Sequence, residues 1–118
     1  MKAFNRNYTE EEKDLLLVDL CGRLPYGVIL SCCDTVGEKL TAIDKNGLVN
    51  HDYDIDEVKP YLFPMSSMTE EQEYKYREVI ASTLNHYEVY DWLNKNHFDY
   101  RDLIEKGLAL DATNKNIY

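Results

Sequence analysis

Three aspartates at alternate positions, Asp52, Asp54 and Asp56, match the opening of a calcium-binding loop. A complete loop of this kind also needs glycine at its sixth position and glutamate at its twelfth. The chain has Glu57 and Phe63 at these positions. We therefore expect the carboxylates to cap a turn and face solvent, and we predict no metal ion or other cofactor.

Cys33, His51 and Asp52 supply the residue types of a nucleophile, a general base and its orienting acid. No local signature connects them, and a cysteine within an apolar strand usually packs without reacting. The histidines His51, His86 and His97 lack the spacing of a zinc site. The sequence therefore predicts a protein that is not an enzyme. A small enzyme that uses a cysteine or a histidine stays open as an alternative.

The richest group of interaction-prone side chains surrounds Trp92 and Phe98, which we expect to anchor the C-terminal half on a sheet. Close by, His97, Tyr100 and Arg101 are expected to be exposed. Tyrosine and arginine are enriched at the hot spots of protein interfaces. The predicted partner-binding surface consists of His97, Tyr100, Arg101, Tyr61, Asp52, Asp54 and Asp56.

The composition is that of one globular domain. The chain has 118 residues, of which 44% are hydrophobic and 30% charged, so it can bury a core without disulfides. The net charge of −9 argues against direct binding to nucleic-acid backbones, which requires a basic patch, and is compatible with a basic partner. Ten tyrosines suit half-buried positions, or a recognition surface.

The cysteines and the chain's first residues favour a cytoplasmic location. Cys32 and Cys33 are adjacent and would point to opposite faces of a strand, so a disulfide between them is not expected. With Cys21 they form an odd set without a C-x-x-C pair, as in a reducing compartment. Residues 1–8 have no apolar signal core, and no apolar run is long enough to span a membrane.

The first half of the chain predicts one helix followed by short strands. Thr9 and Glu12 form a capping box for a helix over residues 9–22, which Gly22 is expected to end. Residues 26–63 then predict a small antiparallel sheet. Within it, Asn46-Gly47 is typical of a hairpin turn.

The segment 58–72 separates the sheet from the helices. Pro60 and Pro64 keep it out of helical geometry, and one or two of the bulky residues 61–63 are expected to be buried. Thr69 and Gln72 form a second capping box. Residues 69–107 are expected to be helical, with a last short helix that Asp99 caps and Gly107 closes.

The expected fold class is thus α+β: an N-terminal helix, three or four short antiparallel strands that resemble an SH3-like half-barrel, and two or three C-terminal helices. Residues 1–8 are expected to be a flexible N-terminus, 9–112 a single domain, and 113–118 a polar tail.

Two segments resemble small uncharacterised proteins encoded by phages and mobile elements of anaerobic gut bacteria. They are Pro-Tyr-Leu-Phe-Pro-Met-Ser-Ser-Met-Thr-Glu-Glu-Gln at 60–72 and Asp-Trp-Leu-Asn-Lys-Asn-His-Phe-Asp-Tyr-Arg-Asp-Leu-Ile-Glu-Lys-Gly-Leu-Ala-Leu-Asp-Ala at 91–112. The Thr-Glu-Glu-Glu start of the first helix and Leu-Pro-Tyr-Gly-Val at 24–28 also fit. The resemblance implies an accessory role in the cytoplasm and brings no activity or catalytic residue.

The first functional hypothesis is a non-enzymatic accessory protein of a phage or mobile element that binds another protein. The alternative of a different class is an acidic inhibitor that mimics nucleic acid and blocks a DNA-binding or defence protein. That alternative requires the carboxylates of 10–12, 52–57 and 70–73 to line one face. Nothing in the sequence indicates the partner or an oligomeric state.

Overall fold

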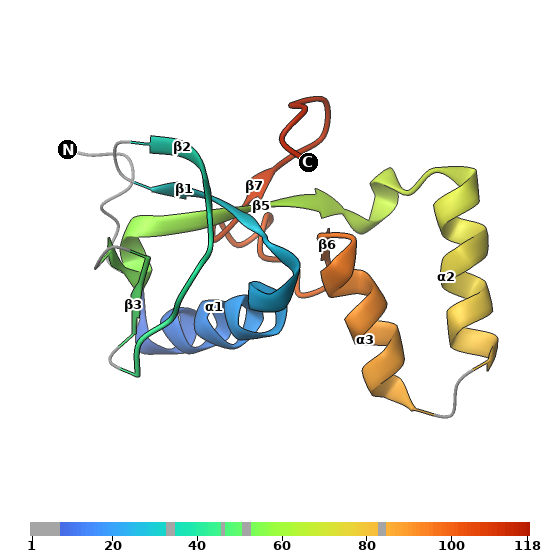
Figure 1. The fold of residues 1–118 in the computed structure, drawn as a ribbon, viewed down its shortest axis with the longest axis horizontal. Coiled ribbons are helices and arrows are strands. Elements are labelled where there is room, and N and C mark those ends of the chain that lie inside the picture. Colours follow the sequence, from blue (N-terminus) through green and yellow to red (C-terminus); the bar gives the residue numbers. More distant parts are fainter. Residues whose placement is uncertain (1–7, 33–34, 46, 51–52, 83–84) are drawn as a thin grey trace.

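The computed structural model describes residues 8–32, 35–45, 47–50, 53–82 and 85–118. It is an α+β fold in which one helix precedes a group of five strands, two helices follow that group, and two further short strands come last (Figure 1). The helices are α1 (Glu10–Arg23), α2 (Glu70–Ser82) and α3 (His86–Lys95), with short 3-10 turns η1 (Leu24–Tyr26), η2 (Ile55–Glu57) and η3 (Met65–Ser67). The strands are β1 (Ile29–Cys32), β2 (Thr35–Lys39), β3 (Leu48–Val49), β4 (Tyr53–Asp54), β5 (Val58–Pro64), β6 (Phe98–Asp99) and β7 (Leu110–Asp111).

The main sheet is built around β5, the strand that contains the two prolines predicted to stay extended. Its antiparallel neighbour is β1, which pairs in turn with β2. On its other side β5 pairs with both β6 and β7, and these pairs are parallel. The sheet is therefore mixed, and the expectation of a purely antiparallel sheet confined to residues 26–63 is corrected.

The stretch after α3 also differs from the expected helix. Asp99 is buried and accepts hydrogen bonds from the backbone N–H groups of Leu103 and Ile104, both at 2.9 Å. These bonds close a run of turns over residues 100–108 rather than a helix. Asp99 accepts backbone N–H groups as predicted, but the segment that follows it is a series of turns, after which β7 pairs with β5.

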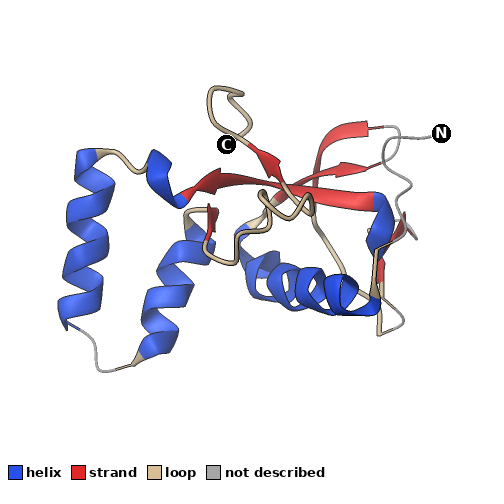
Figure 2. Ribbon diagram, turned by 180° about the vertical axis from the view of Figure 1, so that it is seen from behind, coloured by secondary structure: helices blue, strands red, loops and turns tan. Residues whose placement is uncertain are grey.

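The core lies between α1 and the sheet, where Figure 2 shows the helix along one face. Leu16 and Leu20 of α1 are fully buried against apolar side chains of the strands and of the final turns. Each such leucine stabilises the fold by about 2 kcal/mol through burial. The sheet-side partners include Val28, Leu30, Val58, Leu62, Leu103 and Leu108.

Both predicted capping boxes are present. Thr9 and Glu12 exchange side-chain and backbone hydrogen bonds at the start of α1, and Thr69 and Gln72 do so before α2. Gly22, in contrast, lies inside α1. A Cβ at this position would stand 3.1 Å from Nδ2 of Asn94, so glycine here permits α3 to approach α1 closely.

A second, two-stranded sheet of β3 and β4 follows the predicted hairpin turn. Gly47 has the positive φ of 84° that such a turn requires, and its N–H bonds to the carbonyl of Asp44; Asn46 lies outside the described residues. The buried Asn50 accepts from the N–H of Thr41 at 2.7 Å and donates to the carbonyl of Lys39 at 2.6 Å. Asn50 therefore fastens this small sheet to the end of β2.

Helices α2 and α3 form a hairpin that projects from the sheet and lengthens the molecule to 45 Å (Figure 1). No described side chain of α2 is fully buried, and the main neighbour of this helix is α3. The apolar side of α2 is only partly covered, and Ile80 remains 48% exposed. We refer to residues 70–95 as the arm.

Stacked rings fasten the arm to the sheet. Trp92 of α3 stacks on Tyr76 of α2 at 5.7 Å and on Phe98 of β6 at 5.9 Å, and Phe98 contacts Phe63 of β5 at 6.1 Å. The predicted anchoring role of Trp92 and Phe98 is confirmed. Among the described residues, no helix combines the length and apolar character needed to cross a membrane.

Candidate functional site

Three tyrosine rings surround a hollow on one side of the arm. Tyr87 and Tyr90 lie one turn apart on α3 and are 81% and 49% exposed. The ring of Tyr90 lies 5.1 Å from that of Tyr100, which follows β6. Arg101 and Asn94 complete the lining of the hollow. We call Tyr87, Tyr90, Tyr100 and Arg101 the tyrosine face.

Tyr100 is fixed in position from beneath. Its hydroxyl donates to Oδ1 of the buried Asn94 at 2.8 Å. The guanidinium groups of Arg23 and Arg101 lie 5.2 Å and 4.9 Å from the centre of its ring, within the range of cation–π attraction. The ring therefore has few orientations open to it, although part of it faces solvent.

The support is a buried ion cluster of Asp19, Arg23 and Arg101. The side chains of Asp19 and Arg23 are 0% exposed and form two hydrogen bonds, at 2.7 Å and 3.1 Å. Arg101 adds a bond to the same carboxylate at 3.0 Å, and Arg23 donates to the carbonyl of Phe98 at 2.7 Å. The cluster thus connects α1, β6 and the tyrosine face. Asp19 and Arg101, which it brings together, are 82 residues apart in the sequence.

The electrostatics around the hollow are mixed. Two guanidinium groups share one carboxylate in the cluster, which leaves it with one excess positive charge. On the exposed side of α3, Asp91 accepts a hydrogen bond from the hydroxyl of Tyr26. That bond raises the pKa of Tyr26, because ionising the phenol would place two negative charges together.

His97 immediately precedes β6 and is not among the residues that line this hollow. It adopts the left-handed backbone conformation, with φ of 64°, and its ring stacks on that of Tyr118 at 3.7 Å. Its Nδ1 is buried without a hydrogen-bond partner among the described residues. Burial, and then the nearby charge of Arg23, lower the pKa of His97 from 6.5 to about 4. His97 is therefore neutral at physiological pH.

Lowering the pH from 6.5 towards 4 is expected to destabilise the fold through His97. The unfolded chain binds a proton near pH 6.5, whereas the folded chain does so only near pH 4, so this contribution is full above 6.5 and is lost as the pH falls. In His97→Asn, which tolerates a left-handed backbone and does not titrate, the free energy of unfolding should fall less over this range. Urea unfolding at several pH values tests this, with the exposed His86→Asn as control. Equal pH dependence in wild type and His97→Asn would contradict it.

The six described residues of the predicted binding surface do not lie together. Tyr100 and Arg101 are half-buried and belong to the tyrosine face, while His97 lies under Tyr118. Tyr61 is only 6% exposed in the middle of β5, so the expectation that it is a surface contact is corrected. Tyr61 and Leu62 are both buried, which confirms the prediction that one or two of the bulky residues 61–63 lie in the core.

Two of the predicted aspartates, Asp54 and Asp56, lie at the other end of the molecule from the arm (Figure 1). Asp54 is exposed and caps η2 together with Glu57, as expected of a turn. Asp56 is half-buried within η2, and Asp52 lies outside the described residues. Among the residues that the structure describes, no group of three acidic, histidine or cysteine side chains could hold a metal ion.

The candidate catalytic set cannot be assembled from the described residues, since Cys33, His51 and Asp52 all lie outside them. Cys21 of α1 is exposed and carries a free thiol.

Sequence reasoning missed Tyr87 and Tyr90, and also Asp19 and Arg23. The spacing of Tyr87, Tyr90 and Asn94, at i, i+3 and i+7, was a signal that they share one helical face. Asp19 and Arg23 stand among the apolar positions of α1, which was a signal of burial.

Comparison with known proteins adds no family to this description. No protein-family model, no curated protein and no solved structure matches the chain.

Proposed function

We propose that this chain is a non-enzymatic accessory protein that binds another protein through the tyrosine face. The observation that carries the proposal is a hollow lined by two exposed rings, Tyr87 and Tyr90, and by the half-buried ring of Tyr100, which a buried ion cluster fixes in position. Tyrosine presents a large contact area with few rotatable bonds, so its side chain loses little conformational entropy when binding orders it. A surface held ready in this way is suited to binding.

The acidic side chains on the exposed side of α3 favour a partner segment that carries lysine or arginine. Glu88 and Asp91 are exposed on α3 beside Tyr87 and Tyr90, and Arg101 is already paired with Asp19. Exposed aromatic faces attract cations, and a chain of net charge −9 steers basic partners towards itself.

A phage or mobile-element origin and a cytoplasmic location are part of this proposal. They are supported by the resemblance of segments 60–72 and 91–112 to such small proteins, and by the cysteine usage.

The alternative of a nucleic-acid mimic has less support. Its carboxylates should share one face, yet the start of α1 contacts η2 at one end of the molecule while α2 starts at the other end (Figure 1). The acidic first turns of α1 and α2 are therefore far apart.

A photo-crosslinking experiment tests the proposal. With p-benzoylphenylalanine in place of Tyr87, the full chain should form one crosslinked product in a host lysate, and an added arginine-rich peptide should suppress it. The same probe in place of Tyr74, which is 68% exposed on α2, is the matched control and should give no such product. A product from position 74 alone, or one insensitive to the basic peptide, would contradict the proposal.

Tyr90→Ala is expected to weaken the complex with the crosslinked partner by about 30-fold, the effect of losing one interface hot spot. Tyr74→Ala should leave affinity unchanged, since it removes an exposed ring from the other helix. Isothermal titration with the purified partner measures both. If Tyr90→Ala binds as tightly as wild type, the contact surface lies elsewhere.

A further inference from the structure

The hydroxyl of Tyr118 takes the place of a backbone contact in the main sheet. Strands β1 and β5 pair in a register that ends with Leu30 opposite Pro60, and one further pair would set Ile29 opposite Tyr61. Instead, Oη of Tyr118 accepts a hydrogen bond from the N–H of Ile29 at 2.8 Å and donates one to the carbonyl of Tyr61 at 2.7 Å.

This pair of backbone groups selects for one kind of ligand. A single neutral hydroxyl can accept from Ile29 and donate to Tyr61 at once. An ammonium group only donates, a carboxylate only accepts, and a phenylalanine ring does neither. Tyr118 as a whole is 42% exposed, but desolvation of its phenol within the slot raises its pKa to about 12, which keeps the hydroxyl neutral.

The walls fit an aromatic ring. Phe63 lies 5.7 Å from the ring of Tyr118, tilted by 53°, while His97 stacks at 3.7 Å and 11°. His97, with its left-handed backbone and an Nδ1 that has no partner among the described residues, forms this second wall. We call the space bounded by Ile29, Tyr61, Phe63 and His97 the phenol slot.

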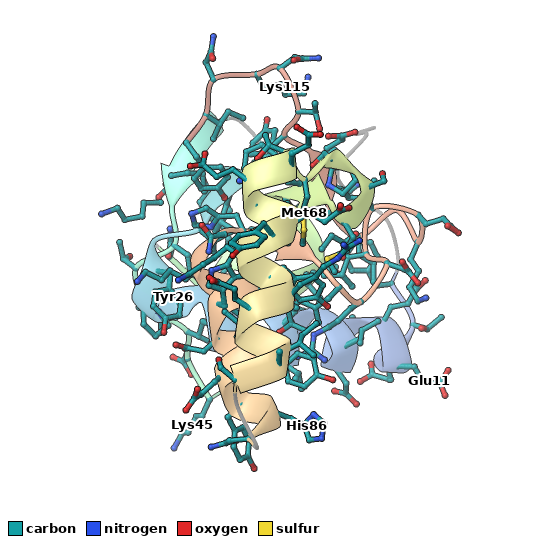
Figure 3. The ribbon with its side chains drawn as sticks, turned by 90° about the vertical axis from the view of Figure 1, so that its right-hand side faces the viewer. Glu11, Tyr26, Lys45, Met68, His86 and Lys115 are labelled. Carbon is teal, nitrogen blue, oxygen red and sulfur yellow. The ribbon has the colours of Figure 1, made fainter. Side chains whose placement is uncertain are left out.

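The segment that delivers Tyr118 is held loosely. After Ala112, residues 113–116 are exposed and form a loop that projects from the body; Figure 3 shows Lys115 at its outer edge. Two local hydrogen bonds shape this loop, from Thr113 to Asp111 and from Lys115 to Ala112. The hydrogen bonds and ring contacts of Tyr118 described above lie in the slot, and none of them belongs to a strand pairing.

We propose that the phenol slot is a binding site for a tyrosine side chain on a partner protein, with Tyr118 as its exchangeable occupant. The slot shares no residue with the tyrosine face, so the inference does not depend on that surface. A tethered side chain competes at an effective concentration of about 1 mM, so a partner tyrosine enters when further contacts with its own segment outweigh that competition.

The test uses the full chain with Tyr118→Ala and p-cresol, the tyrosine side-chain analogue. We expect p-cresol to bind this variant saturably, to raise its Tm, and to shift the NMR signals of Phe63 and His97. Toluene, which lacks the hydroxyl, should bind about tenfold more weakly. In Tyr118→Phe the ring fills the slot without the two hydrogen bonds of the hydroxyl, so p-cresol should displace it at a lower concentration than it displaces Tyr118 in the wild type. A peptide Asn-Ile-Tyr should likewise bind Tyr118→Ala about tenfold more tightly than Asn-Ile-Phe.

Three results would overturn the inference. Absence of p-cresol binding would show that β1 and β5 close directly once Tyr118 is gone. Equal binding of toluene and p-cresol would show an apolar cavity without recognition of the hydroxyl. A wild-type dimer that Tyr118→Ala abolishes would identify the occupant as a second copy of this chain.

Wild-type protein supplies a readout if Tyr118→Ala does not fold. Excess p-cresol should release the tail, so that the amide signals of residues 113–117 move towards their unfolded positions. Unchanged signals at saturating p-cresol would count against exchange.

Discussion

Replacement of Asp19 by alanine is expected to reduce the free energy of unfolding by about 3–5 kcal/mol, the usual cost of removing one partner of a buried ion pair. The substitution leaves Arg23 charged and 0% exposed, with one acceptor, the carbonyl of Phe98. Its Nη1 already has no partner among the described residues. The loss comes from this uncompensated charge more than from the attraction that is removed.

Urea unfolding of Asp19→Ala measures this effect, and Glu73→Ala is the matched control. Glu73 pairs with Arg77 at 3.5 Å in the same i, i+4 spacing, but both side chains are more than half exposed. That variant should lose less than about 1 kcal/mol. A loss for Asp19→Ala as small as that of the control would mean that water reaches Arg23, and that Tyr100 is not held by a dry cluster.

Elements with local chemistry were predictable from sequence. The side chains of Thr9 and Thr69 fix where α1 and α2 begin, because a capping box is complete within four residues. Gly47 fixes a turn for the same reason, through its own backbone conformation. The anchoring by Trp92 and Phe98 followed from the size of their rings, since so much apolar area is rarely left in water.

Elements that depend on distant partners were not predictable. Strands β6 and β7 have two residues each, too few to show an alternating pattern, and they form only because β5 offers free backbone groups. Tyr118 stands in a polar tail, and nothing near it in sequence signals that its hydroxyl bonds to Ile29 and Tyr61. Tyr100 and Arg101 were recognised by residue type, whereas their geometry comes from Asp19 of a helix far away in the chain.

Phe98→Ala is expected to cost about 3–5 kcal/mol of unfolding free energy and to loosen the arm in the folded state. Phe98 is 1% exposed, and its ring connects Trp92 of the arm to Phe63 of the sheet. Its removal leaves a cavity where arm and sheet meet. Trp92 is the only tryptophan in the chain, so its fluorescence reports on this junction directly.

The two effects can be separated by experiment. In Phe98→Ala without denaturant, Trp92 emission should shift to longer wavelength, because water reaches one face of the indole. Phe98→Leu refills most of the cavity, and both the shift and the loss of stability should be smaller. If Phe98→Ala loses stability while Trp92 emission is unchanged, the arm is held mainly by the close approach of Gly22 to Asn94. In that case α1, rather than the ring stack, positions the tyrosine face.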